Sequence, residues 1–213
     1  MSYKIKEIFY SIQGEGYYSG RPAVFCRFAG CNLWSGKEED RKDARCQFCD
    51  TDFVGQNGIN GGFYPSASEL AHKASLAWPK KKNKSAKPFV VCTGGEPLLQ
   101  LDYALISDLH EEGFEIAVET NGTILAPAGI DWICVSPKVG TQLAQASGHE
   151  LKLVYPQVGV RPEEYAKLNF RHFFLQPMDG VDREEATKQT LKYVLAHPKW
   201  RISLQLHKIL GVR

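Results

Sequence analysis

The sequence predicts an α/β fold, a partial and open barrel of about six parallel strands with few helices. Short apolar runs rich in β-branched or aromatic residues recur along the chain, and a polar cluster follows each run. Helical patterns separate only some of these runs. A complete eight-stranded β/α barrel typically needs about 250 residues, and this chain has 213. An incomplete barrel is therefore the better fit.

Seven runs have the short, apolar character of strands that are buried on both faces. They span residues 23–28, 89–92, 115–118, 132–135, 151–154, 172–175 and 201–206. The carboxyl ends of parallel strands meet at one side of such a barrel, where active sites are built. We therefore expect the polar clusters to line one cavity, although each cluster taken alone could be an ordinary turn.

Three segments predict helices. A capping box of Ser66 and Glu69 opens the first, over residues 66–78. Residues 101–112 have helical spacing and stop at a glycine. Residues 182–197 begin at an aspartate and end before a proline. The segments near positions 126 and 143 are short and rich in Gly and Pro, so some crossovers are predicted to be loops.

Composition excludes several classes of protein. The net charge of +2, from 26 basic and 24 acidic residues, lacks the basic excess of a nucleic-acid-binding domain. No apolar stretch approaches the roughly 18 residues that cross a bilayer, and the first residues lack a secretory signal. We expect one cytoplasmic domain over residues 1–213. The basic run at 80–87 is predicted to be a solvated loop, with phosphate binding as the alternative.

Six cysteines in a reducing compartment indicate metal binding or catalysis instead of disulfides. Cys46 and Cys49 can bind one centre from a single turn, and Cys31 lies at a strand end, separated from Cys46 by fourteen residues. A 4Fe-4S cluster normally takes four thiolates, so three leave one iron open. The charged loop 35–45 is predicted to be a surface insertion and not a structural element. The alternative is a Cys3His zinc site, with a histidine such as His72 as fourth ligand. The other cysteines lie in apolar runs and are predicted to be structural: Cys26, Cys92 and Cys134.

Together with these cysteines, further motifs resemble radical S-adenosylmethionine enzymes, and closely resemble the 7-carboxy-7-deazaguanine synthase family of the queuosine precursor pathway. The matching stretches extend over nearly the whole chain. They are residues 11–16, 49–51, 93–97, 119–122, 136–138, 176–178 and 205–208. The usual cluster motif of the superfamily is C-x3-C-x2-C. The C-x14-C-x2-C spacing departs from it and resembles a subset of this synthase family.

The resemblance implies a lyase that converts 6-carboxy-5,6,7,8-tetrahydropterin to 7-carboxy-7-deazaguanine with loss of ammonia, in a pathway of tRNA modification. It implies a 4Fe-4S cluster on the three cysteines, S-adenosylmethionine used catalytically, and Mg²⁺ with Thr51 as a ligand. It also implies a homodimer and an electron donor such as flavodoxin. Two alternatives stay open: another radical enzyme, such as an activase of a protein partner, and a zinc-binding interaction module.

The resemblance also implies the remaining site residues, with no side chain assigned a certain catalytic role. Cofactor contacts are expected at Phe48, Asp50, Gly94, Gly95, Glu96, Ser136, Lys138 and Gln176. Substrate contacts are expected at Gln13, Glu15, Gly16, Arg27, Thr93, Gly95, His207 and Arg213.

Physical arguments support some of these assignments. Gln13 and Glu15 can read the guanidine-like edge of a pterin by paired hydrogen bonds. Arg27 lies on a strand between aromatic residues, so we expect it to pair with the substrate carboxylate, with a structural ion pair as the alternative. Glycines at 94–95 would let a ligand approach the backbone. Glu96 would accept a hydrogen bond from the ammonium of the methionine part.

Overall fold

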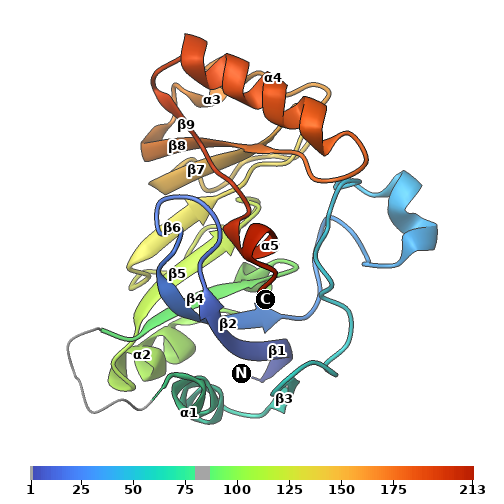
Figure 1. Cartoon of the computed structure of the whole chain (residues 1–213). Coiled ribbons are helices and arrows are strands. Elements are labelled where there is room, and N and C mark those ends of the chain that lie inside the picture. Colours follow the sequence, from blue (N-terminus) through green and yellow to red (C-terminus); the bar gives the residue numbers. More distant parts are fainter. Residues whose placement is uncertain (1, 80–86) are drawn as a thin grey trace.

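A nine-stranded sheet forms the centre of the computed structural model, which describes residues 2–79 and 87–213 (Figure 1). Seven neighbouring strands run parallel and follow the order of the chain. They are β2 (Pro22–Phe28), β4 (Phe89–Gly94), β5 (Glu115–Thr120), β6 (Trp132–Val135), β7 (Ser147–Tyr155), β8 (Asn169–Pro177) and β9 (Trp200–Ile202). The predicted open, parallel barrel is confirmed.

Two strands that we did not predict as antiparallel complete one edge of the sheet. β1 (Tyr3–Ile12) pairs antiparallel with β2, and β3 (Gly62–Tyr64) pairs antiparallel with β1. At the other edge, the run predicted over residues 201–206 is a strand only as far as Ile202. The chain turns there because the Leu206 amide donates to the Gly14 carbonyl at 2.8 Å.

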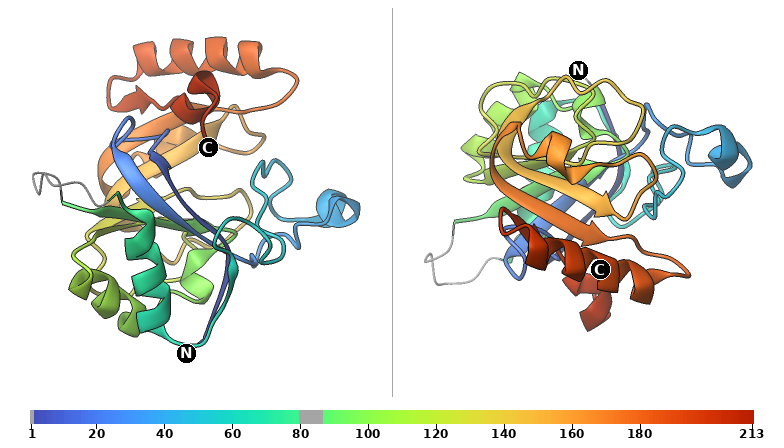
Figure 2. Two further views of the ribbon diagram at one scale, coloured as in Figure 1. Left: turned by 60° about the horizontal axis from the view of Figure 1, so that its bottom comes forward. Right: turned by 90° about the horizontal axis from the view of Figure 1, so that it is seen from above.

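The three predicted helices are confirmed to within two residues at each end. They are α1 (Ala67–Ala77), α2 (Tyr103–Glu111) and α4 (Arg183–Ala196). The Ser66 and Asp102 side chains accept hydrogen bonds from amides of the first turn of α1 and α2. Figure 2 shows α1 and α2 together beside the sheet, and α4 over its β8–β9 end.

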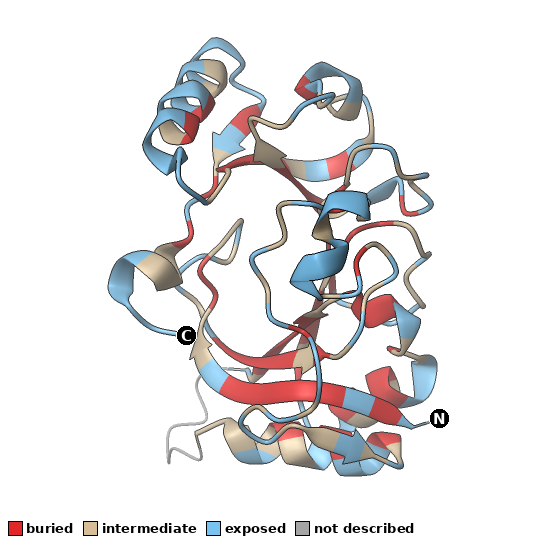
Figure 3. Cartoon of the chain, turned by 90° about the vertical axis from the view of Figure 1, so that its right-hand side faces the viewer, coloured by how far each residue is buried: buried red, intermediate tan, exposed pale blue. Residues whose placement is uncertain are grey.

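The main core lies between the sheet and the α1–α2 pair. Alternate residues of the central strands point to this side because successive side chains of a strand face opposite ways. Among the buried members are Val90, Cys92, Ile116 and Val118 from the sheet, with Leu70, Leu105 and Ile106 from the helices. The other face of the same strands carries a smaller buried cluster that includes Phe89, Val91 and Ala117, and the site lies beyond it at the carboxyl ends of the strands. Figure 3 shows that the burial follows the central strands.

The insertion at 35–45 is more ordered than predicted. It contains the 3₁₀ helix η1 (Glu38–Asp43), and the Arg41 guanidinium lies 4.1 Å from the centre of the Trp34 ring. Arg41 also donates to the carbonyls of Gln47 and Cys49, at 2.9 and 3.1 Å. The prediction of a loop without structure was wrong, because Arg41 bonds the insertion to the segment that carries the cysteines.

Three further short helices had no clear signal in the sequence. They are η2 (Pro97–Leu99), α3 (Pro162–Tyr165) and α5 (Leu206–Leu210). Residues 80–86, which hold most of the basic run, lie outside the described residues. Within the described part of the chain, no helix combines the length and the apolar character that a membrane crossing requires.

The turn between β1 and β2 closes the amino ends of the parallel strands. Tyr17 stacks on Trp132 and His172, with ring centres 5.0 and 4.4 Å apart. Tyr18 contacts Trp132 and Phe89 at 4.6 and 5.1 Å between ring centres. Trp132 and Phe89 are the first residues of their strands. The inner side of the sheet is therefore closed at this end, and the carboxyl ends are left open.

Glu150 holds this turn against β7. Its Oε2 accepts from the Tyr17 amide at 3.1 Å, and the Gly16 amide donates to Ser203 Oγ at 2.9 Å. Gly16 has φ +63°, and a Cβ there would lie 1.9 Å from Glu150 Oε1. A residue with a side chain at 16 would therefore be strained and would clash.

We predict that Gly16→Ala destabilises the protein more than Gly20→Ala. Gly20 has φ +88° with open space around its missing Cβ, so alanine there costs only backbone strain, about 1 kcal/mol. Gly16→Ala adds overpacking of about 1–3 kcal/mol. Urea unfolding of the two variants measures the difference, and equal losses of unfolding free energy would contradict it.

Candidate active site

One cavity of about 530 Å³ lies at the carboxyl ends of the parallel strands. Its volume is typical of a small-molecule site, and the polar clusters meet there as expected. Every predicted site residue lines it except Gly16 and Glu96. The lining residues are Gln13, Glu15, Arg27, Cys31, Cys46, Phe48, Cys49, Asp50, Thr51, Thr93, Gly94, Gly95, Ser136, Lys138, Gln176, His207 and Arg213.

The three predicted cluster cysteines are unpaired thiols on the wall of this cavity. Cys31 and Cys49 are half-buried and Cys46 is buried. A hydrogen bond from Cys46 lowers the pKa of Cys49 to about 6, so a thiolate is available near neutral pH. The Leu33 amide donates to Cys31 Sγ at 3.4 Å. Thiolate and backbone donors of this kind suit an iron–sulfur centre.

The described residues do not place a fourth zinc ligand with the cysteines. Within residues 2–79 and 87–213, no three His, Cys, Asp or Glu side chains are grouped to hold one metal ion. His72, the expected fourth zinc ligand, lies on α1 and contacts Glu112 at 3.2 Å, away from the cavity. The geometry therefore does not support the zinc site.

Lys138 places a half-buried ammonium beside the cysteines. Its Nζ donates to the carbonyl and to Oγ of Ser136, both at 2.8 Å, and lies 5.7 Å from the centre of the Phe48 ring. Burial lowers the pKa of Lys138, while the charges of Cys46 and Cys49 act in the opposite direction. The predicted cofactor contacts Phe48, Ser136 and Lys138 thus form one group.

Gly94 and Gly95 allow the carboxyl ends of β2 and β4 to pack closely together. A Cβ on Gly94, which has φ +139°, would lie 2.3 Å from the Phe28 carbonyl oxygen. A Cβ on Gly95 would lie 2.0 Å from the Gly30 carbonyl oxygen. We expected these glycines to make room for a ligand. The structure instead explains them by the contact between the ends of β2 and β4, although both also line the cavity.

Glu96 is placed differently from its prediction. Its carboxylate is fully buried and accepts from the Leu98 amide at 3.0 Å, and from Thr120 Oγ1 and the Asn121 amide, both at 2.8 Å. Burial raises the pKa of Glu96 despite these hydrogen bonds. The residue ties the end of β4 to the end of β5. A contact with a methionine ammonium would require it to turn away from these donors.

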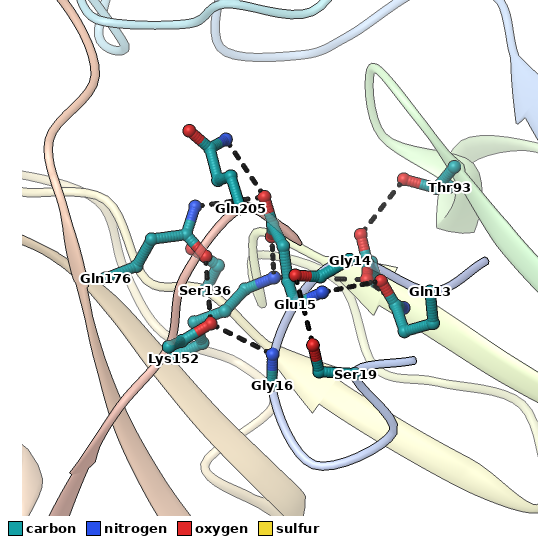
Figure 4. Close-up of polar contacts among 12 residues, drawn as sticks. Gln13, Gly14, Glu15, Gly16, Ser19, Thr93, Ser136, Lys152, Gln176 and Gln205 are labelled. Atoms are coloured by element: carbon teal, nitrogen blue, oxygen red, sulfur yellow. Dashed lines mark hydrogen bonds and ion pairs between the residues drawn. The ribbon is translucent and has the colours of Figure 1, made fainter. Parts of the chain in front are cut away.

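A buried polar network forms the floor of the cavity (Figure 4). Glu15 Oε1 accepts from Gln176 Nε2 and Gln205 Nε2, both at 3.0 Å, and Glu15 Oε2 is paired with Lys152. Burial opposes ionisation of Glu15, but the Lys152 charge and these hydrogen bonds outweigh it and lower the pKa. Glu15 was predicted to read the substrate. Here both of its oxygens are engaged by the protein.

Glu119 is a site residue that the sequence analysis missed. Gln13 Nε2 donates to its Oε1 at 2.9 Å, and Thr93 Oγ1 donates to its Oε2 at 3.3 Å. Its side chain is 26% exposed against 16% for Glu15, so it offers more of its carboxylate to the cavity. The available signal was its place at the carboxyl end of β5, where the polar cluster begins.

Two arginines share one carboxylate on another part of the cavity wall. Glu7 Oε1 pairs with Arg27 Nε at 2.9 Å, and Glu7 Oε2 pairs with Arg213 Nη1 at 3.2 Å. The structural ion pair considered for Arg27 is thus present. Among the described residues, however, Arg27 Nη1 and Nη2 have no hydrogen-bond partner, and they are available to an anion.

A second ion-pair group connects the cysteine segment to α5. Lys208 Nζ lies 2.6 Å from Asp50 Oδ2 and 2.6 Å from Asp179 Oδ2. Lys208 and Asp179 were not predicted as site residues. His207, which was predicted, packs on Gly14, where a Cβ would lie 2.0 Å from His207 Nδ1.

The open parallel barrel, with three unpaired cysteines beside a polar cavity at its strand ends, matches the radical S-adenosylmethionine class that the sequence motifs resemble. No family model matches the chain. The chain is 59% identical over 213 residues to 7-carboxy-7-deazaguanine synthase of Bradyrhizobium diazoefficiens, and 57% identical over 212 residues to that of Caulobacter vibrioides, with full coverage of both. The crystal structure of QueE from Escherichia coli matches with a TM-score of 0.70 and 27% identity, over 97% of this chain and 95% of that one. This chain belongs to the 7-carboxy-7-deazaguanine synthase family.

We predict that Cys31→Ala, Cys46→Ala and Cys49→Ala each lose the broad visible band of a reconstituted iron–sulfur cluster, because each removes one ligand. Cys92→Ala is the matched control, since Cys92 is fully buried in the main core. Visible spectra after anaerobic reconstitution with iron and sulfide make the comparison. A full band in any of the first three variants would remove that cysteine from the ligand set.

Proposed function

We propose that the cavity carries out the family's reaction, the conversion of 6-carboxy-5,6,7,8-tetrahydropterin to 7-carboxy-7-deazaguanine with loss of ammonia. The observation that carries the proposal is one cavity that combines three cysteines, an anionic floor and a cationic wall. The cysteines suit an iron–sulfur cluster, the anionic floor suits the N–H-rich ring of the pterin, and the cationic wall suits its carboxylate. Family membership and the polar, small-molecule-sized cavity favour this reaction over an activase.

The residues on the open side of the cavity fit the cofactors of this class. Cys31, Cys46 and Cys49 would hold a 4Fe-4S cluster. When bound, the cluster would supply the electron, and S-adenosylmethionine the radical, that this class of reaction requires. The proposed contacts with S-adenosylmethionine are Phe48, Asp50, Gly94, Gly95, Ser136, Lys138 and Gln176.

The charges of the cavity suggest how the substrate lies. The substrate carboxylate would face Arg27 and Arg213, whose partner Glu7 is shared. The N–H edge of the pterin would face Glu119, which Gln13 and Thr93 hold in place. A carboxylate accepts paired N–H donors well, and the closed floor keeps water from the ring. His207 would contact the ring from α5.

Further proposals follow from the family resemblance. Flavodoxin is the proposed electron donor, a homodimer is the proposed assembly, and no nucleic acid is expected to bind. The continuous sheet supports residues 1–213 as one domain. Unpaired cysteines suit the reducing cytoplasm.

The direct test is turnover. Reconstituted enzyme with S-adenosylmethionine and a reductant should convert 6-carboxy-5,6,7,8-tetrahydropterin to 7-carboxy-7-deazaguanine, with one ammonia released for each product. Product is measured by chromatography and ammonia by a coupled assay. Cleavage of S-adenosylmethionine without deazaguanine would refute the proposal and favour another radical enzyme.

We predict that Mg²⁺ binds appreciably only when substrate is present. Thr51 is the proposed protein ligand, and one threonine oxygen cannot hold an ion that prefers six oxygens, so the substrate carboxylate must complete the site. Calorimetric titration of Mg²⁺ with and without substrate tests this. Tight binding to the substrate-free enzyme would count against it.

A further inference from the structure

Lys152 lies on β7 at the centre of the floor and is 5% exposed. Its ammonium pairs with Glu15 and lies 3.9 Å from Glu119 Oε1. Ammonium groups are rarely buried without a partner, because removal from water is costly. Here one cation serves two carboxylates that come from the β1–β2 turn and from β5.

These two carboxylates form the layer directly beneath the substrate cavity. Both line the large cavity, and both also line a second one of about 10 Å³ on the side of Tyr18 and Glu150. Glu15 in turn orients the amides of Gln176 and Gln205. A change in the charge of either carboxylate therefore changes the electrostatic potential and the hydrogen-bonding groups at the cavity surface.

The charge balance of the floor is simple. Glu15 and Glu119 contribute two negative charges and Lys152 contributes one positive charge, so one negative charge remains facing the cavity. Without Lys152, two carboxylates would share a buried site, and like charges there force one of them to take up a proton. A neutral acid at either position changes the hydrogen-bonding pattern of the floor.

We propose that Lys152 is a positioning residue for the ring contraction, because its charge offsets the repulsion between the Glu15 and Glu119 carboxylates beneath the substrate. This rests on the proposed function and deepens it by assigning the floor a single net negative charge, which selects a ring with an N–H-rich edge. Lys152 acts through its two partners.

Other ionisable groups surround this trio. Burial raises the pKa of Glu150, whose carboxylate is held by the Tyr17 amide and by Trp132 Nε1. Burial also opposes the charged form of Lys152, but its acidic neighbours outweigh it and raise the pKa. The groups facing the trio from the packed elements are Cys134 on β6, Glu150 on β7, Asp50 in the cysteine segment and Lys138 after β6.

The test is the pH profile of kcat/KM for reconstituted Lys152→Met. In the wild type the lowered pKa of Glu15 keeps the floor charged at neutral pH. In the variant one carboxylate binds its proton more tightly, so the acid limb of the profile moves to higher pH, by roughly 1–3 units. The dissociation constant of the substrate, measured by calorimetry at neutral pH without turnover, should rise by the same factor by which kcat/KM falls at that pH.

The double variant Lys152→Met/Glu15→Gln separates charge from packing. It leaves one negative charge on the floor, that of Glu119. The amide carbonyl introduced at position 15 can still accept hydrogen bonds from Gln176 and Gln205. Its acid limb should return toward the wild-type position, with roughly tenfold recovery of kcat/KM over the single variant. Arg21→Met is the matched control. Arg21 lies on the same β1–β2 turn as Glu15, and the substitution breaks its half-buried ion pair with Glu115 on β5. It removes no charge from the cavity, so it should lower stability without moving the acid limb of the profile.

The outcomes are distinct. An unshifted acid limb in Lys152→Met, or a folded double variant no better than the single one, overturns the proposal. Failure of both variants to fold also overturns it, because Lys152 would then act through the fold alone. If only the single variant fails to fold, an active double variant with the wild-type limb supports it. Wild-type turnover is measured alongside, and its absence would refute the proposed function instead.

Discussion

The ion pair between Glu15 and Lys152 is the interaction on which the site depends. It joins the β1–β2 turn to β7 across the inner side of the sheet, and so turns an open, curved sheet into a cavity with a floor. Two charges can be buried here because Gln176 and Gln205 satisfy the remaining acceptor positions of Glu15. Loss of one partner would leave a buried charge without compensation.

One face of the sheet packs against the helices in the main core, and the other face bears the polar residues of the cavity. The period of two along each strand sends apolar residues such as Val90 and Ile116 toward the helices. The opposite face of β5, β6 and β7 sends Glu119, Cys134 and Lys152 inward. A charged residue can therefore follow directly after a core residue, as Lys152 follows Leu151, without disturbing the core.

The cysteine segment shows how an enlarged loop is kept ordered near a reactive site. The insertion separates Cys31 from Cys46, but Arg41 stacks on Trp34 and donates to the carbonyl of Cys49. Lys208 then connects neighbouring Asp50 to α5. The wide spacing in sequence is thus compatible with three cysteines on one cavity wall.

The sequence by itself determined the parallel strands, the three longer helices, the Ser66 cap of α1 and the strand-end clusters, because each depends on residues close together in the chain, whereas the expected cap Asp182 makes no capping hydrogen bond in the described part of the chain. Only the tertiary structure decided the pairing of Glu15 with Lys152 and the placement of Glu119, which join residues more than a hundred positions apart. It also turned Glu96 inward and assigned the glycines at 94 and 95 to strand packing. Local patterns show that a residue is polar or small. Which residue it contacts depends on which strands become neighbours in the sheet.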